Sequence, residues 1–402
     1  MSTSNMSNKK IKSHRIDSRA NKKIEMEEFK VKNYKHYFLT SESVTKGHPD
    51  KVADLISDRI LDEYLKEDKN SRVAVETLIS NNKVTVAGQV SSNIQVDIEK
   101  IVRDTLKSVG YNDAETTMDY KTCDVEVNLT EQSGDIALGV DDGGAGDQGI
   151  IFGYATEETD EYMPYPISLA HKLSKKIDEV RENNILPYLK ADGKVQVTIE
   201  YINDIPIRID TILISVQHSE EVELVQLQKE ILENVILETV DPEMLDIETK
   251  FYINPTGRFV IGGAKADTGL TGRKIIVDTY GGIARHGGGA FSGKDATKID
   301  RSGAYMLRHI AKNVVVNGLA RRCEIQMAYG IGLKHPLSIY IDCFVTNRIP
   351  EGLIIKLIKE KFDLTPKGII NYLKLQEPIY AKTTNYGHFG REEFNWEKIV
   401  QI

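Results

Sequence analysis

One pattern of hydrophobic residues recurs three times along this chain: a helical period, two alternating segments, and a second helical period. Each pair of alternating segments predicts a β-hairpin, and the hairpins begin at residues 72, 194 and 323. These starts are 122 and 129 residues apart, which is too long for a stacked solenoid repeat. Because the helices do not alternate singly with strands, we predict an α+β fold of three sheet-plus-helix subdomains around a pseudo-threefold axis.

The first copy is the clearest. Strands are predicted at residues 72–80 and 83–90, across an Asn81-Asn82 turn, with helices at 49–65 and 96–109. The other two copies follow the same pattern, with helices at 167–189, 220–236, 296–319 and 351–362, and strands at 194–203, 206–218, 323–332 and 337–345.

The repeats predict subdomains at residues 37–136, 137–262 and 263–402. Residues 1–36 contain ten Lys and Arg against four Asp and Glu, and no apolar segment of the kind found in secretory signals. We expect a disordered basic tail there, in preference to a targeting or RNA-binding segment.

The 402-residue chain carries a net charge of −8, so its body is acidic and a poor match for nucleic acid. Any polyanion must therefore be bound by a local cluster of cations. No apolar run approaches the roughly eighteen residues of a membrane span. Three cysteines, Cys123, Cys323 and Cys343, form no CxxC pair, which indicates a reducing compartment such as the cytoplasm.

A dense cluster of glycine and basic residues spans residues 259–298. Glycines let backbone N–H groups approach phosphate oxygens, and lysine or arginine supplies the opposing charge. We therefore predict a polyphosphate site, with a solvated basic loop as the alternative. Its cations are Arg273, Lys274, Arg285, Lys294 and Lys298.

Residues 288–294 also fit the GxxxxGK spacing of a P-loop. However, Asp295 stands where Mg²⁺ coordination requires Ser or Thr. The strand predicted at 274–279 also ends well before the glycines. A P-loop is therefore not expected.

Three further places carry polar chemistry. Pro49 predicts a helix start, with His48 at its cap and Asp50 in its first turn. This arrangement suits a phosphate group with Mg²⁺. Alternatively, Asp50 is an ordinary acidic residue that complements the helix dipole. Glu76 lies within a hydrophobic strand and needs a basic residue or a metal ion as partner. The acidic, glycine-rich segment 131–149 is either a linker or a lid.

Several of these residues belong to long strings that occur in a fixed order: SESV at 41–44, GHPDK at 47–51, GAGDQG at 144–149, INPTGRFVIGG at 253–263, LTGRKIIVDTYGG at 270–282 and YGHFGR at 386–391. In these strings, and across about residues 37–398, the sequence resembles methionine adenosyltransferases, also called S-adenosylmethionine synthetases. The resemblance implies a transferase that joins ATP to methionine and then hydrolyses the triphosphate to phosphate and diphosphate.

The resemblance also implies roles for individual residues. The triphosphate would be held by His48, Lys194, Arg273, Lys274 and Lys294, of which all but Lys274 would be catalytic. The rest of ATP would contact Asp192, Arg258, Phe259, Asp267 and Ala290, and methionine would contact Gln89, Gln132, Asp267 and Lys298. Two Mg²⁺ per site would use Asp50 and Asp300, and K⁺ would use Glu76. Family members form dimers with shared active sites, usually paired into tetramers.

The implied chemistry suits this set of residues, because a thioether sulfur has no proton to lose and needs no general base. The transition state instead needs cations around a highly charged leaving group. Gln89 departs from the family, where most members have Glu against the methionine ammonium. The alternative function is that of a catalytically weak paralogue acting as a partner subunit, and a polyphosphate hydrolase is a third possibility.

Overall fold

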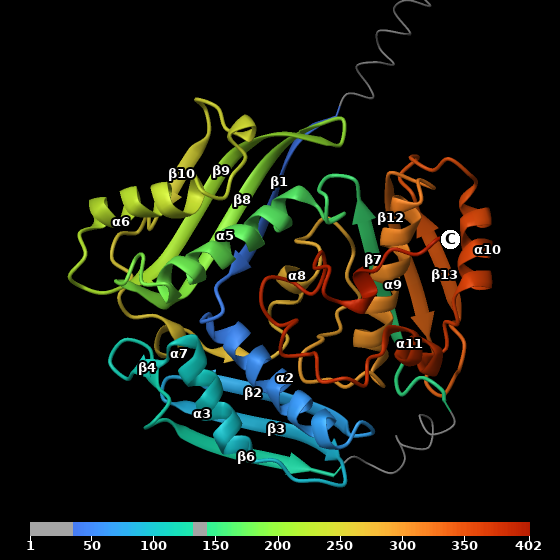
Figure 1. Cartoon of the computed structure of the whole chain (residues 1–402), viewed down its shortest axis with the longest axis horizontal. Coiled ribbons are helices and arrows are strands. Elements are labelled where there is room, and N and C mark those ends of the chain that lie inside the picture. Colours follow the sequence, from blue (N-terminus) through green and yellow to red (C-terminus); the bar gives the residue numbers. More distant parts are fainter. Residues whose placement is uncertain (1–34, 132–142) are drawn as a thin grey trace, which may run out of the picture.

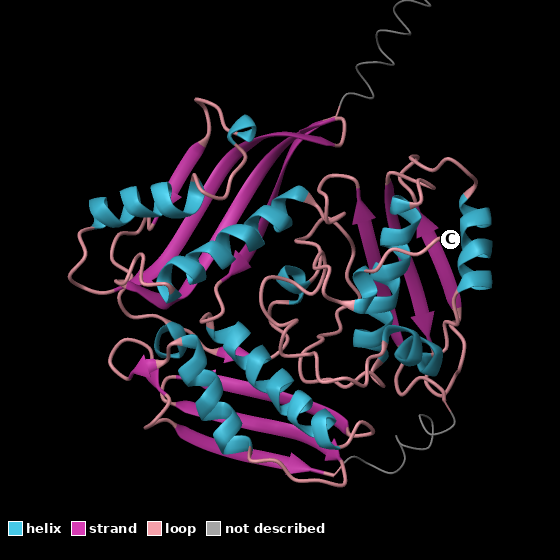
Figure 2. Cartoon of the chain, in the orientation of Figure 1, coloured by secondary structure: helices cyan, strands magenta, loops and turns pink. Residues whose placement is uncertain are grey.

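The computed structural model describes residues 35–131 and 143–402 as three units, each a β-sheet covered by helices (Figures 1 and 2). Most of the basic tail and residue Gln132 lie outside the described residues. The chain is therefore a mixed α and β protein with several sheets, as the hairpin pattern indicated.

The first unit has the strand order β11-β2-β3-β6. β2 and β3 are antiparallel across the Asn81-Asn82 turn, where Asn81 adopts a positive φ of 53°. The elements are β2 (Arg72–Ser80), β3 (Lys83–Ser91), β6 (Asp124–Thr130), β11 (Gly269–Leu270), α2 (Pro49–Glu67) and α3 (Ile98–Val109).

The second unit has the strand order β1-β8-β9-β10. Its elements are β1 (His36–Val44), β8 (Leu189–Ile202), β9 (Ile205–His218), β10 (Lys250–Ile253), α5 (Tyr165–Glu182), α6 (Leu224–Ile231) and a π-helical turn (Leu232–Ile236). The third unit has the order β13-β12-β7. Its elements are β7 (Gly149–Thr156), β12 (Arg322–Tyr329), β13 (Ser338–Asp342), α9 (Ile299–Val316), α10 (Glu351–Lys361) and α11 (Pro366–Leu373).

The remaining elements are short. They are β4 (Asn112–Asp113), β5 (Met118–Asp119), α7 (Gly263–Ala266), α8 (Ile275–Asp278) and two 3₁₀ turns at Pro242–Met244 and Asn395–Glu397. In Figure 1, α8 lies near the centre, between the three units.

Each of the three larger sheets includes a strand from a neighbouring part of the chain. β1 precedes α2 but pairs with β8, and β7 precedes α5 but pairs with β12. β11 follows the whole second unit but pairs with β2. These exchanged strands tie the units together, and one hydrophobic core runs through the first and third units while a second core fills the middle one.

Two predicted elements were wrong. The helix predicted at 167–189 ends at Glu182, where Asn184 turns with a φ of 55° and Pro187 cannot continue the helix. The strand predicted at 274–279 is the short helix α8, because its Asp278 is drawn into buried contacts with Lys51.

Glu76 lies within β2 as predicted, but its side chain is exposed on the outer face of the sheet, so water can solvate the carboxylate. None of the helices in the described part of the chain is both long and apolar enough to cross a membrane.

Candidate active site

The edge of β2 receives two separate segments of the chain. β11 pairs with one part of this edge, and Val75 N donates to Gly293 O at 3.0 Å further along. Residue 293 must be glycine, because its φ is +78° and a Cβ there would lie 1.9 Å from Val75 O. The β11 segment continues into Arg273 and Lys274, and the segment at Gly293 continues into Lys294. Cations about twenty residues apart in sequence therefore meet at one strand edge.

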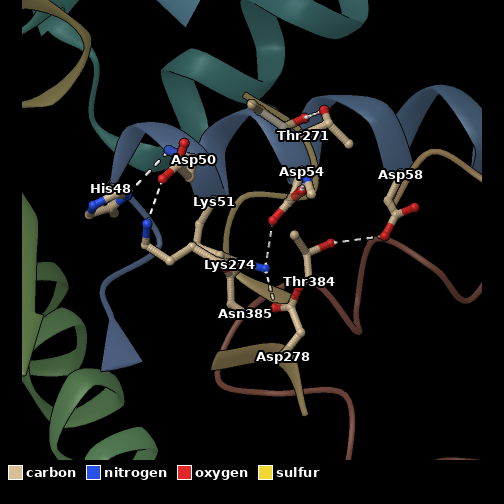
Figure 3. Close-up of polar contacts among 12 residues, drawn as sticks. His48, Asp50, Lys51, Asp54, Asp58, Thr271, Lys274, Asp278, Thr384 and Asn385 are labelled. Carbon is tan, nitrogen blue, oxygen red and sulfur yellow. Dashed lines mark hydrogen bonds and ion pairs between the residues drawn. The ribbon is translucent and has the colours of Figure 1, made fainter. Parts of the chain in front are cut away.

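Figure 3 shows Asp50, Asp54 and Asp58 along α2. These aspartates hold the two segments by accepting hydrogen bonds from backbone N–H groups. Asp50 Oδ1 accepts a hydrogen bond from Leu270 N at 3.0 Å, and Asp54 Oδ1 accepts one from Gly272 N at 2.8 Å. Both contacts fix the segment just before Arg273. Hydrogen bonds to a carboxylate are about twice as strong as neutral ones, so they hold the segment firmly.

The series continues along the same helix. Asp58 Oδ1 accepts from Gly293 N at 2.8 Å, next to Lys294. One turn further, the two oxygens of Asp62 accept from Tyr380 N at 2.9 Å and Ala381 N at 2.8 Å. We call these four residues, Asp50, Asp54, Asp58 and Asp62, the α2 aspartate series.

Two buried cations neutralise the middle of the α2 aspartate series. Arg301 donates to both oxygens of Asp58 at 2.7 and 2.8 Å. Lys51 donates to Asp54 at 2.9 Å and to Asp278 on α8 at 2.6 Å. Burial raises the pKa of Asp278 to about 7, although the charge of Lys51 opposes the shift. These ion pairs are inaccessible to water, so the negative charge of each carboxylate is stabilised by its cation and not by solvent.

His48 caps α2, and its Nδ1 accepts a hydrogen bond from Asp50 N at 3.2 Å. Burial, followed by the positive charge of Lys274, lowers the pKa of His48 to about 3. The imidazole is therefore neutral at pH 7 and carries its proton on Nε2, where it is a hydrogen-bond donor. Burial alone would raise the pKa of Asp50, but hydrogen bonds, the first of them from Lys274 Nζ at 2.6 Å, hold it below its ordinary value.

A cavity of about 340 Å³ opens beside the second segment. Glu76, Gln89, Ala290 and Lys294 line it, so four residues predicted from different parts of the sequence share one cavity. Lys294 Nζ also donates to Asp300 Oδ2 at 2.8 Å, which joins a fifth predicted residue to the group.

Lys194 lies on β8, with its Nζ 3.9 Å from Glu42 on β1, and its charge contributes to the low pKa of His48. Asp192, two residues before it, accepts a hydrogen bond from Gly263 N at 2.8 Å. Burial raises the pKa of Asp192 to about 6, and the nearby charge of Asp267 adds to the rise. Lys194, Asp192 and Asp267 therefore lie near the helix start at His48.

Other predicted residues stand apart within this single chain. Arg258 pairs with Glu220 at 2.8 Å on the surface, and neither Arg258 nor Phe259 lines the cavity at Lys294. Lys298 donates a hydrogen bond to Asp295, so that aspartate has a structural role. No helix follows the glycines directly, since α9 begins at Ile299, and the P-loop reading is excluded. Gln132 lies outside the described residues.

Of the α2 aspartate series, only Asp50 was predicted from the sequence, and Asp54, Asp58 and Asp62 were missed. The available signal was an aspartate at every fourth position of a predicted helix. Such a stripe is usually a solvated helix face, and nothing local indicated burial. Asp278 was missed because its segment was predicted as a strand.

The comparison with protein families matches all three parts of the chain. The N-terminal, central and C-terminal domains of S-adenosylmethionine synthetase match residues 36–134, 142–259 and 261–398. The chain belongs to the S-adenosylmethionine synthetase family. It is 54% identical over 387 residues to the S-adenosylmethionine synthases of two strains of Staphylococcus epidermidis, covering 92% of this chain and 97% of each relative.

The family's use of Mg²⁺ fits the residues present. Mg²⁺ takes one or two carboxylates and completes its shell with water and phosphate oxygens. Asp50 and Asp300 each provide one carboxylate next to a lysine. Among residues 35–131 and 143–402, no three His, Cys, Asp or Glu side chains converge as a ready metal site.

We predict that Asp58→Asn lowers the free energy of unfolding by about 3 kcal/mol or more, because it leaves the buried guanidinium of Arg301 without its counter-charge. Urea unfolding at pH 7 measures the change. Glu63→Gln on the same helix is the control, because its exposed pair with Lys66 contributes less than about 1 kcal/mol. Equal stability of the two variants would contradict the role of the α2 aspartate series.

Proposed function

We propose that this protein makes S-adenosylmethionine by attack of the methionine sulfur on C5′ of ATP, which expels triphosphate, and that it then hydrolyses the triphosphate to phosphate and diphosphate. The observation that carries the proposal is the gathering of Arg273, Lys274 and Lys294 along one edge of β2, close to the neutral donor His48. The membership of the family supports it across the whole chain.

The residues account for catalysis by electrostatics. Breaking the C5′–O bond moves negative charge onto a leaving group that is already highly charged. Fixed cations aimed at that charge lower the barrier, because they need no reorganisation during the reaction. In our proposal Lys194, Arg273, Lys274 and Lys294 bind the triphosphate, and His48 Nε2–H donates a hydrogen bond to it. No proton is removed from the sulfur, so no general base is assigned.

Asp50 and Asp300 are the proposed ligands for two Mg²⁺, and Glu76 is proposed to help bind K⁺. Bound Mg²⁺ would neutralise phosphate oxygens and fix their geometry. Lys274 and Lys294 already pair with these two aspartates. Each lysine can turn from its carboxylate to a phosphate oxygen when the nucleotide binds, which leaves the carboxylate available to the metal.

For the two substrates, we assign Asp192, Arg258, Phe259, Asp267 and Ala290 to the nucleoside end of ATP. Gln89, Gln132, Asp267 and Lys298 are assigned to methionine. Gln89 shares its cavity with Lys294, so the methionine would lie close to the triphosphate. Arg258 and Phe259 stand outside this cavity, which favours a site completed by a second subunit.

We infer a homodimer with shared active sites, paired into a tetramer. The outer faces of all three sheets leave large apolar side chains 42–52% exposed. Such exposure over three sheets exceeds what isolated surface residues explain and is typical of a subunit interface. These side chains are Leu78, Phe38, Tyr252, Ile150 and Tyr340. Glu76 lies on the same strand face as Leu78, and Lys194 lies on the same sheet face as Phe38.

The three units support a pseudo-threefold arrangement, because each has a sheet with helices on one face. We also propose a cytoplasmic location. Cys123, Cys323 and Cys343 are free and buried, which suits a reducing compartment.

Replacing Lys294 with alanine should lower turnover about a hundredfold while the fold persists, since it removes one preorganised cation from the triphosphate. Steady-state assays with ATP and methionine, together with circular dichroism, measure both effects. Lys356→Ala, on the exposed face of α10, is the control. A near-wild-type rate for Lys294→Ala would remove this lysine from the site.

The methionine site can be tested at Gln89. Gln89→Glu should lower the methionine KM several-fold and leave the ATP KM almost unchanged, because a charged hydrogen bond to the ammonium contributes roughly 1.5–3 kcal/mol against about 1 kcal/mol for a neutral one. An unchanged methionine KM would exclude Gln89 from the substrate site. A wild-type protein with no turnover at all would favour the reading of a weak partner subunit.

A further inference from the structure

A small cavity of about 20 Å³ lies where the glycine-rich loop 285–291 meets β7. A cavity can hold a water molecule once its volume reaches roughly 10–15 Å³, so this one has room for a single water and is too small for a substrate. His286 and Asp300 are among the polar residues that line it, and Ile150 and Phe152 of β7 form another part of the wall. Of these residues, only Asp300 has a part in the mechanism proposed above.

The glycines of the loop bring His286 to Asp300. A Cβ on Gly287 would lie 1.7 Å from Ile150 O, and a Cβ on Gly289 would lie 2.3 Å from Asp300 Cγ. Both positions therefore require glycine, because a side chain would collide with the strand or with the carboxyl group. The loop backbone is thus in contact with both β7 and Asp300, and His286 is held beside them.

The hydrogen bonding of the His286 ring places its proton. Gly288 N donates a hydrogen bond to His286 Nδ1 at 2.8 Å, so Nδ1 is an acceptor and the proton of the neutral ring is on Nε2. Burial lowers the pKa of His286, against the opposing charge of Asp300, which favours this neutral form at pH 7. His286 therefore offers an N–H donor and cannot act as a general base.

Asp300 connects the cavity with the proposed triphosphate site. Its Oδ2 accepts a hydrogen bond from Lys294 Nζ at 2.8 Å, and Lys294 is a proposed ligand of the triphosphate. Its Oδ1 has no hydrogen-bond partner among the residues that the structure describes. A water molecule in the cavity can therefore donate to Oδ1, and it is then close to a phosphoryl group held by Lys294.

The lining favours a neutral water molecule over an anion. Arg285 is a cation of the lining, but its Nε pairs with Glu324 Oε1 at 2.9 Å and its backbone N donates to Glu324 Oε2 at 2.9 Å. Its charge is therefore balanced by Glu324. His286 and Asp300 provide one N–H donor and one carboxylate acceptor. A water molecule can accept a hydrogen bond from the first and donate one to the second.

We propose that His286 Nε2 and Asp300 Oδ1 hold the water molecule that hydrolyses triphosphate, an inference that rests on the function proposed above. The two hydrogen bonds leave a lone pair of the water oxygen for attack on a terminal phosphorus. The new P–O bond forms as the bridging P–O bond breaks, whose electron pair leaves with diphosphate, and the water proton stays on the phosphate product. Attack of the sulfur on C5′ uses no water, so His286 serves the second step alone.

The test compares the two steps in His286→Asn. The Oδ1 of asparagine can still accept a hydrogen bond from Gly288 N, but the side chain is too short to replace the Nε2 donor. We expect S-adenosylmethionine formation in a single turnover to stay within about threefold of wild type, and hydrolysis of added triphosphate to slow about tenfold or more. Triphosphate should then accumulate, which rapid quenching and phosphorus NMR detect.

His286→Gln is the matched variant, since its amide N–H reaches about as far as Nε2 and should retain more hydrolysis than His286→Asn. His335→Asn, at an exposed histidine outside this cavity, should change neither step. Unchanged hydrolysis in His286→Asn would overturn the inference, and so would an equal loss of both steps, which would indicate a purely structural role. If the wild type formed no sulfonium, the proposed function would fail, and the rate with added triphosphate would still decide the role of His286.

Discussion

The candidate site depends on carboxylates that one helix presents at every turn. Asp50, Asp54 and Asp58 accept backbone hydrogen bonds from the two segments that bring lysines and an arginine to the edge of β2, and Asp62 holds the C-terminal segment in the same way. Residues four apart in a helix lie on one face, so a single straight element aligns segments more than 200 residues away in sequence. The remaining geometry of the site follows from this alignment.

Such an arrangement has an energetic cost and, under the function that we propose, a catalytic use. Buried carboxylates are unfavourable unless they are paired, and Lys51 and Arg301 provide that pairing inside the protein. Because the backbone is already fixed, the cations that follow it are held near one another before any polyphosphate arrives. In the mechanism that we propose, electrostatic catalysis works through these fixed charges, which would link the stability of α2 to the chemistry of the site.

The sequence was sufficient to predict those helices and strands whose residue pattern is local. Alternating residues and the Asn81-Asn82 turn predicted the first hairpin within one residue. It could not show that β1, β7 and β11 join sheets of other units, because pairing between distant segments leaves no local pattern. For the candidate site, His48, Asp50, Lys274 and Lys294 were predicted from motifs and resemblance. The aspartates beyond Asp50 were missed because burial, not residue type, gives them their role.

The most direct measurement is the product balance of the purified full chain with ATP, methionine, Mg²⁺ and K⁺, followed by mass spectrometry and phosphorus NMR. Our account predicts S-adenosylmethionine, phosphate and diphosphate in equal amounts, with formation of the sulfonium strictly dependent on methionine. Phosphate release from ATP or triphosphate without any S-adenosylmethionine would contradict it.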